Sequence, residues 1–277
     1  MQHNGRITMA NLGHRGRFGN QVFQYAFLRI YADRHGLRLQ TPRWIGQYLF
    51  GHSEPRITEK PPTTVTQVDL KNAFSSQEPP HVDADFNSQF MSNMKNYEPY
   101  KAKFVSLFQP VPPISTIVEA GMEKLRKQGK TVIALHLRRG DFLNARFAKH
   151  PRNFPIPNAW YLNWLAELWP RINKPVLYIA SDDLKAVLPD FVAYRPVTAA
   201  DVFPEFPSEP KFVRIDPSIY PDFYVMTQSD ALAISNSSFS FAASLLNERC
   251  WKFMRPHKSG KLVPYKPWKS DVRLNLR

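Results

Sequence analysis

The amino-acid sequence predicts an α/β fold with two Rossmann-like domains, and three features support this. Residues 7–40 read as a strand, a glycine-spaced loop, a helix and a second strand, an order typical of a parallel sheet. A further series of strand and helix segments occupies 131–248. Clustered prolines at 110–113 separate the two regions. We therefore expect an N-terminal domain over 1–113 and a C-terminal domain over 114–277.

Apolar periodicity defines the elements of the first domain. Short strands are expected over 7–12 and 37–40, and residues 20–35 between them repeat apolar side chains at helical spacing. From 42 to 113 the periodicity fades, because prolines divide the chain into loops and short elements. We expect one helix there, over 97–108, and we assign acceptor recognition to this region.

The second domain alternates continuous apolar runs, typical of strands covered on both faces, with helical segments. Strands are expected over 131–137, 176–180 and 231–235. Helices are expected over 116–128, 160–169, 183–188, 222–229 and 237–248. Parallel sheets bind ligands at the carboxyl ends of their strands. The residues that follow these strands are therefore the first candidates for a site.

The composition excludes several classes of protein. Hydrophobic residues make up 43% of the 277 residues, which excludes a disordered chain. The one cysteine excludes an internal disulfide and a cysteine-rich zinc site, and the eight histidines lack metal-ligand spacing, so we expect no metal and no cofactor. The N-terminus lacks an apolar signal region and no apolar run is long enough to span a bilayer, so a cytoplasmic location is expected.

Positive charge is concentrated near the C-terminus. The chain has a formal net charge of +14, and 249–277 carries nine Lys or Arg against one acid. A solvated basic surface, peripheral contact with an anionic membrane and a polyanion-binding protein are all compatible with this segment. Its aromatic residues suit single-stranded nucleic acid. However, no nucleic-acid-binding motif is present and the interleaved prolines are typical of a tail wrapped over the body, so no nucleic acid is expected.

The strongest candidate site follows the strand 131–137, in the segment HLRRGDF. It brings His136, Arg138, Arg139 and Asp141 to the carboxyl end, and strand alternation puts His136 and Arg138 on one side. A guanidinium offers a planar fork that matches two phosphate oxygens and stays charged at any working pH. The alternative, an Arg paired only with Asp141 on the surface, is disfavoured by the buried strand. The segment predicts a site for a sugar-nucleotide diphosphate.

Three other segments carry candidate residues. Ser237 and Ser238 open the last helix, where free backbone N–H groups and the helix dipole favour an anion; the alternative is that they are plain N-caps. Asp182 and Asp183 follow a buried strand and can equally cap a helix. The glycine-spaced loop at 16–21 allows a close backbone approach but lacks GxGxxG, which disfavours a dinucleotide cofactor.

Taken together, four segments resemble one family. The bacterial α-1,2-fucosyltransferases, and more distantly the α-1,6- and protein O-fucosyltransferases, have segments similar to GRFGNQVFQYA, HLRRGDF, YIASDD and ISNSSFSFAASLL. The specific parts of the resemblance are HxRRxD and SNSSFS. It implies a GT-B fold with the donor site in the C-terminal half, a GDP-fucose donor, inversion at the anomeric carbon and no metal requirement. The implied acceptor is a glycan, with α-1,2 transfer to galactose as the expected linkage.

The resemblance also implies roles for individual residues. Arg138 would be the principal diphosphate ligand, with Arg139 supporting the geometry. His136 and Asp222 would meet the guanine. The remaining donor contacts would come from Ser237, Ser238, the Phe239 backbone, Asn20 and Arg17, while Asp182 and Asp183 would hold the site together.

Two departures limit the resemblance. The α-1,6 relatives carry a carboxylate ten residues after the histidine, where this chain has Arg146. No general base is therefore assigned, and Asp141, the nearest acid, stands beside Arg138 as a candidate catalytic residue. The usual aromatic pair after SNSSFS is replaced by Phe241 and Ala242. A transferase of the same fold that uses another GDP-sugar and a polyanion-binding protein are kept as alternatives.

Overall fold

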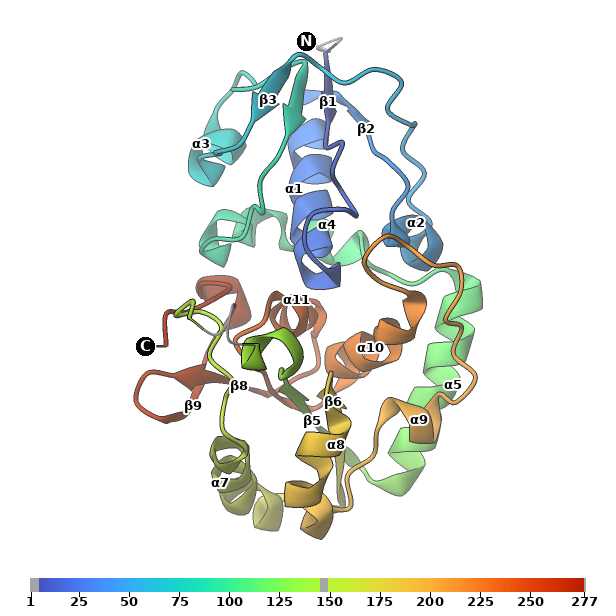
Figure 1. Ribbon diagram of the computed structural model, residues 1–277, viewed down its shortest axis with the longest axis vertical. Coiled ribbons are helices and arrows are strands. Elements are labelled where there is room, and N and C mark those ends of the chain that lie inside the picture. The colour runs from blue at the N-terminus through green and yellow to red at the C-terminus, as the bar shows by residue number, and fades with distance from the viewer. Residues whose placement is uncertain (1–4, 145–148, 277) are drawn as a thin grey trace. The chain divides into compact units, whose positions relative to one another are not determined.

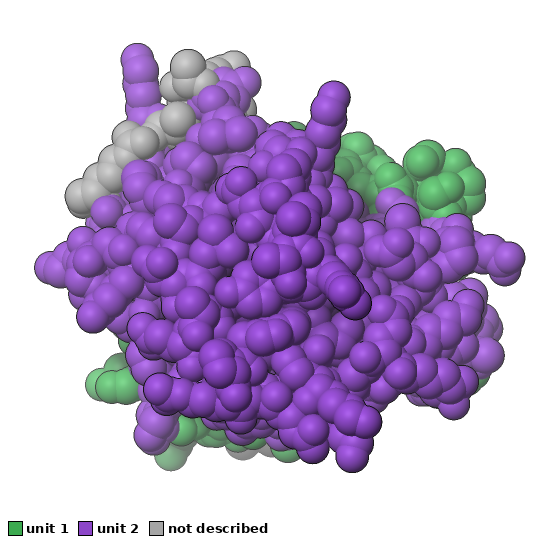
Figure 2. Space-filling model, turned by 90° about the horizontal axis from the view of Figure 1, so that it is seen from below, with its two compact units in different colours: residues 1–112, 208–217 green, residues 113–207, 218–277 purple. Residues whose placement is uncertain are grey.

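The computed structural model describes residues 5–144 and 149–276, so Arg146 lies outside the described residues. Contacts divide the chain into two compact units, which Figure 2 distinguishes by colour. They are Met1–Pro112 with Ser208–Pro217 (unit 1), and Pro113–Pro207 with Ser218–Arg277 (unit 2). This division differs from the predicted boundary mainly in the segment 208–217, which folds with unit 1 although it is far away in sequence.

Unit 1 is built on a four-stranded parallel sheet with the strand order β2-β1-β4-β3 (Figure 1). The strands are β1 (Arg6–Thr8), β2 (Arg38–Gln40), β3 (Thr63–Val65) and β4 (Ala84–Phe86). The helices are α1 (Phe18–His35), α2 (Ile45–Phe50), α3 (Leu70–Ser75) and α4 (Lys101–Ser106). The helix α1 joins β1 to β2, as the predicted strand-loop-helix-strand order requires, and the Phe27 ring on it stacks on Phe90 with centroids 3.9 Å apart.

The region from 42 to 113 is more regular than the sequence indicated. Two strands of the sheet, β3 and β4, and the short helices α2 and α3 lie within it. The prediction was wrong here because each strand is three residues long, too short for an alternating pattern to show. The prolines at 112 and 113 form the first turn of the next helix, a position that suits proline because the first N–H groups of a helix have no partner within the helix.

Unit 2 contains a five-stranded sheet with the order β6-β5-β7-β8-β9, in which only β9 runs antiparallel. The strands are β5 (Thr131–Leu137), β6 (Pro175–Ser181), β7 (Ala231–Ala233), β8 (Lys252–His257) and β9 (Lys261–Pro264). The helices are α5 (Pro112–Gln128), α7 (Asn158–Leu168), α8 (Leu184–Val187), α9 (Ala199–Val202), α10 (Tyr220–Gln228) and α11 (Ser238–Leu246).

Short 3-10 helices complete the two units. They are η1 (Met94–Asn96), η2 (Glu98–Tyr100), η3 (Gly140–Leu143), η4 (Trp169–Arg171), η5 (Leu188–Tyr194), η6 (Pro217–Ile219) and η7 (Pro267–Lys269). Across residues 5–144 and 149–276, no helix is both long and apolar enough to cross a bilayer.

The basic C-terminal segment is part of the second sheet, not a tail wrapped over the body, because β8 and β9 lie within it. The Arg255 side chain in β8 is buried, with its Cζ 5.5 Å from the Phe241 ring centroid and 5.2 Å from that of Tyr265. Its Nη1 donates to the Asp271 carbonyl at 2.8 Å. Aromatic faces stabilise a buried guanidinium, so β8 tolerates a buried arginine. The sequence pattern did not predict a strand here.

The strand β5 crosses the core of unit 2 and leads directly into the candidate site. Ile133 and Leu135 belong to an apolar cluster with Tyr161 and Leu165 of α7. Strand alternation sends the intervening side chains to the other face, where His136 contacts α11. The strand is therefore apolar along its length because helices cover both of its faces.

Candidate anion-binding site

Arg138 is held between two carboxylates at the carboxyl edge of the second sheet. In the parallel pairing of β5 and β6, Leu137 lies opposite Ser181, so the next residues, Arg138 and Asp182, leave the sheet side by side. The Nη1 of Arg138 lies 2.6 Å from Asp182 Oδ2. Its Nε and Nη2 donate to Asp141 Oδ1 at 3.1 and 2.5 Å.

These contacts leave part of the guanidinium available for a ligand. Arginine has five N–H donors, and Asp141 and Asp182 occupy three of them. Among the described residues, one N–H on each terminal nitrogen of Arg138 has no partner, and the side chain is 13% exposed. Two such groups match two oxygens of one phosphate. The two carboxylates therefore fix the orientation of the guanidinium and leave two of its N–H groups for a ligand.

Arg139 turns inward and supports the loop. It is buried, its Nη1 donates to the Arg138 carbonyl at 3.1 Å, and its Nη2 donates to Asn158 Oδ1. Its backbone N–H donates to Asp182 Oδ1 at 2.7 Å. One aspartate thus holds the backbone of one arginine and the side chain of the other.

Gly140 makes this arrangement possible and was not singled out in the sequence. Its φ is +21°, and a Cβ there would lie 2.1 Å from Asp182 Oδ2. A side chain would therefore displace the carboxylate that holds Arg138. Gly140 is part of the segment HLRRGDF, but nothing in the sequence indicated that a carboxylate following the neighbouring strand approaches it.

His136 is neutral and fixed by two hydroxyl groups. Its Nδ1 lies 2.8 Å from Ser240 Oγ of α11 and 2.8 Å from Ser235 Oγ. Burial, reinforced by the charges of Arg138 and Arg139, lowers the pKa of His136 to about 3. The Nε2 atom makes no hydrogen bond to any described residue, which leaves one ring nitrogen for a ligand.

The helix α11 begins beside this histidine. Ser237 is its N-cap, with the side-chain oxygen accepting from the Phe239 N–H at 3.3 Å, as the capping alternative expects. The Phe239 ring lies 5.4 Å from the His136 ring and 5.4 Å from the Phe223 ring of α10. The first turn, with Ser238, thus stands next to the end of β5, where its N–H groups favour an anion.

Asp222 lies in the first turn of α10, next to Phe223. Its Oδ1 accepts from the Tyr178 hydroxyl at 2.7 Å. Burial raises the pKa of Asp222 to about 6, and the Tyr178 hydrogen bond limits this rise. The half-buried carboxyl group thus titrates closer to neutral pH than an exposed aspartate.

Other predicted residues are placed differently. Asp183 caps α8, where its Oδ1 accepts from the Ala186 N–H at 3.1 Å. Arg17 and Asn20 belong to unit 1, at the start of α1. Arg17 is exposed, whereas Asn20 packs so closely on Gly16 that a Cβ there would lie 2.5 Å from Asn20 Nδ2.

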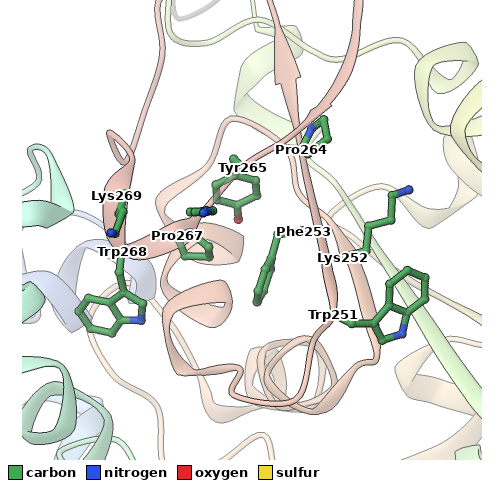
Figure 3. A pocket seen from close by; sticks show the side chains of 9 residues that line it. Trp251, Lys252, Phe253, Pro264, Tyr265, Pro267, Trp268 and Lys269 are labelled. Atoms are coloured by element: carbon green, nitrogen blue, oxygen red, sulfur yellow. The ribbon is translucent and has the colours of Figure 1, made fainter.

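A separate hollow of about 480 Å³ lies at the amino end of β8 (Figure 3). It is lined by Trp251, Lys252, Phe253, Pro264, Tyr265, Lys266, Pro267, Trp268 and Lys269. The indoles of Trp251 and Trp268 stand on opposite sides, with Phe253 and Tyr265 between them. Among the described residues, no arginine or carboxylate lines it. It lies at the opposite end of the strands from Arg138, so it is distinct from the anion site.

A metal site is not evident in the part of the chain that the structure describes. Within residues 5–144 and 149–276, no group of three or more His, Cys, Asp or Glu side chains could hold a metal ion.

No family model and no curated protein matches the chain, but solved structures do. The crystal structure of NodZ α-1,6-fucosyltransferase soaked with GDP-fucose aligns over 95% of this chain and 99% of that chain, with a TM-score of 0.60 at 11% identity. The chain has the GT-B fold of these fucosyltransferases. The selenomethionine form of NodZ from Bradyrhizobium gives a TM-score of 0.63 at 13% identity, over 95% of this chain and 99% of that chain.

Two further fucosyltransferases align with the chain. A variant of Arabidopsis thaliana FUT1 in complex with GDP gives a TM-score of 0.60 at 11% identity, over 92% of this chain and 71% of that chain. POFUT1 in complex with GDP-fucose gives 0.52 at 14% identity, over 91% and 97% of the two chains. At these identities the likeness is one of fold, and it confirms the predicted fold class.

Proposed function

We propose that this protein transfers L-fucose from GDP-fucose to a hydroxyl group of a glycan, with inversion at the anomeric carbon and without a metal ion. The observation that carries this proposal is the Arg138 fork, held between Asp141 and Asp182 with one N–H on each terminal nitrogen that donates to no described residue. The similar structures of NodZ and POFUT1 contain GDP-fucose or GDP, which supports a GDP-sugar as the ligand.

The charge distribution suits the departure of a diphosphate. The acceptor oxygen attacks the anomeric carbon as the bond from that carbon to the β-phosphate oxygen breaks. The electron pair of the broken bond leaves with GDP, and the proton of the acceptor hydroxyl passes to a base. Positive charge grows on the sugar and negative charge on the leaving group. Arg138 and the N–H groups at the start of α11 would stabilise that negative charge.

Asp141 is better suited to orienting Arg138 than to removing the proton. One of its oxygens accepts two N–H groups from Arg138, so this oxygen is engaged in holding the guanidinium. If the bond to GDP breaks early, proton transfer comes late and asks less of a base. We therefore assign Asp141 a positioning role and leave the general base unassigned.

Guanine recognition is proposed for Asp222 and His136. A carboxylate accepts N–H groups of guanine, and Asp222 uses one oxygen on Tyr178 and keeps the other. Neutral His136 presents Nε2 beside the Phe239 ring. Arg17 and Asn20 of unit 1 are proposed to serve the sugar, on the strength of the segment GRFGNQ alone.

The linkage and the location rest on the sequence. The proposal of α-1,2 transfer to galactose follows the resemblance of HLRRGDF and SNSSFS to the bacterial α-1,2-fucosyltransferases, whereas the similar NodZ structure is that of an α-1,6-fucosyltransferase. A cytoplasmic location, with peripheral contact at an anionic membrane, is a prediction from composition and charge.

The test is transfer from defined donors. Purified protein is incubated with GDP-fucose or GDP-mannose and a panel of β-galactosides, and the product linkage is determined by NMR. We expect a fucosylated product with an α-1,2 bond to galactose. Turnover with GDP-mannose alone would show that the fold serves another GDP-sugar, and turnover with neither donor on any acceptor would contradict the proposal.

A further inference from the structure

The segment that follows β9 returns to the carboxyl edge of the second sheet, where Asn236 holds it. The buried Asn236 side chain donates to the Leu274 carbonyl at 2.7 Å and accepts from the Leu274 N–H at 2.9 Å. The same nitrogen donates to the Arg152 carbonyl at 3.0 Å. Asn236 immediately precedes the N-cap of α11, so this pairing places Arg273 at the edge of the anion site.

Arg273 links separate loops through one guanidinium. Its Nε donates to the Asn236 carbonyl at 3.2 Å, and its Nη2 donates to Asn153 Oδ1 at 2.6 Å. Its Cζ lies 5.6 Å from the Phe142 ring centroid, and the Cζ of Arg138 lies 5.8 Å from the same centroid. The Nη1 atom of Arg273 donates to no described residue. Two guanidiniums thus share one aromatic ring, and each keeps an available donor.

Like charges accumulate around this ring. The guanidiniums of Arg138 and Arg152 lie close enough to Arg273 to act on its charge, and the Asp141 carboxylate offsets part of their effect. Burial and the charge of Arg152 lower the pKa of Arg273 to about 10, Arg138 acts in the same direction and Asp141 opposes it. A group with this pKa is a cation at neutral pH. Repulsion among these charges costs free energy that a bound anion would offset.

We infer that Arg273 is a second guanidinium ligand of the donor diphosphate, with its Nη1 pairing with a phosphate oxygen while Nε and Nη2 hold the loops around Arg138. The ligand's identity rests on the proposed function. Arg273 would thus join Arg138 in binding the diphosphate. In the sequence, Arg273 is one of nine basic residues in the C-terminal segment and has no further distinguishing feature. This role of Arg273 also gives a reason for the two hydrogen bonds by which the Asn236 side chain holds the backbone N–H and carbonyl groups of Leu274.

The test compares Arg273→Gln with Lys258→Gln, a matched loss of one charge at an exposed position of the same segment. Calorimetry measures binding of GDP, guanosine and inorganic pyrophosphate to the full chain. A hydrogen bond to a charged group predicts that Arg273→Gln weakens GDP binding by about tenfold to a hundredfold. Guanosine binding should not change, because guanosine carries no phosphate. Lys258→Gln should bind all three ligands as the unaltered chain does.

Each outcome decides between the possibilities. A GDP affinity in Arg273→Gln equal to that of the unaltered chain would overturn the inference. An equal loss of affinity for guanosine and for GDP would also overturn it, because Arg273 would then only support the loops. If the unaltered chain fails to bind GDP, the proposed function fails, and the inference is then decided by pyrophosphate binding. A tenfold lower pyrophosphate affinity in Arg273→Gln supports the inference. Equal pyrophosphate affinity in the two proteins, or no pyrophosphate binding by the unaltered chain, overturns it. If Arg273→Gln does not fold, Arg273→Lys replaces it. Lysine keeps the charge but loses the fork, so a GDP affinity equal to that of the unaltered chain would overturn the inference.

Discussion

Substitution of Gly140 by Ala is predicted to damage the site through Asp182. The new Cβ would lie 2.1 Å from Asp182 Oδ2, whereas ordinary contact begins near 3.4 Å. The carboxylate therefore has to move by about 1 Å, which pulls it away from the Arg138 side chain. A misplacement of about 1 Å in a group that positions the reactants lowers the rate about 100-fold, equivalent to about 2.7 kcal/mol of barrier.

The backbone contributes a second, separable effect. A non-glycine residue held at a φ of +21° costs about 1–3 kcal/mol of stability. Gly260→Ala is the matched control, since the φ of Gly260 is +80° and the new Cβ would lie no closer than 4.0 Å to its nearest neighbour in the described residues, Trp160 Cζ2. Both variants therefore carry backbone strain, but only Gly140→Ala disturbs a carboxylate.

The assay is GDP release from GDP-fucose in the presence of a β-galactoside acceptor, with thermal unfolding measured in parallel. Gly140→Ala should lose about 100-fold in rate, while Gly260→Ala should lose stability and keep its rate. Equal rates in the two variants would refute the reasoning that Gly140 is required by the approach of Asp182.

Three further predictions concern neighbouring groups. Because burial raises the pKa of Asp222 to about 6, the folded chain binds this proton more tightly than the unfolded chain, and stability falls as the pH rises from about 4 to about 6; Asp222→Asn should flatten urea-unfolding free energies over that window, and an unchanged slope would count against it. The pKa of His136 is lowered to about 3, so its NMR ring signals should stay constant from pH 5 to 8, and a titration near 6.5 would disprove its neutrality. Ser237→Ala removes the cap of α11 and should cost about 1 kcal/mol of unfolding free energy; no change in a urea titration would show that the cap contributes nothing.

The long elements were predictable because they bury continuous apolar surface. The strand β5 is found at its predicted bounds, and α1, α7, α10 and α11 lie within a few residues of theirs. The three-residue strands β3 and β4 could not be predicted, since their partners in the sheet rather than their own side chains define them. The strand β8 was missed because Arg255 interrupts its apolar character.

The placement of three candidate residues was predictable from the ends of the strands. Arg138, Asp182 and His136 follow from strand alternation and from the rule that ligands bind at carboxyl ends. The partners of Arg138 could not be ranked in advance, because the register between β5 and β6 is what selects Asp182 over Asp183. Arg273 carries no local signal, since only the tertiary hydrogen bonds of Asn236 bring it to the edge of the sheet.

The most direct test of the account removes the Arg138 side chain. GDP release from GDP-fucose is measured for the unaltered chain, for Arg138→Ala and for Arg171→Ala, a matched loss of an exposed arginine in the same unit. We expect release by the unaltered chain and by Arg171→Ala, and none by Arg138→Ala, with circular dichroism showing all three folded. Release by a folded Arg138→Ala at the rate of the unaltered chain would contradict it.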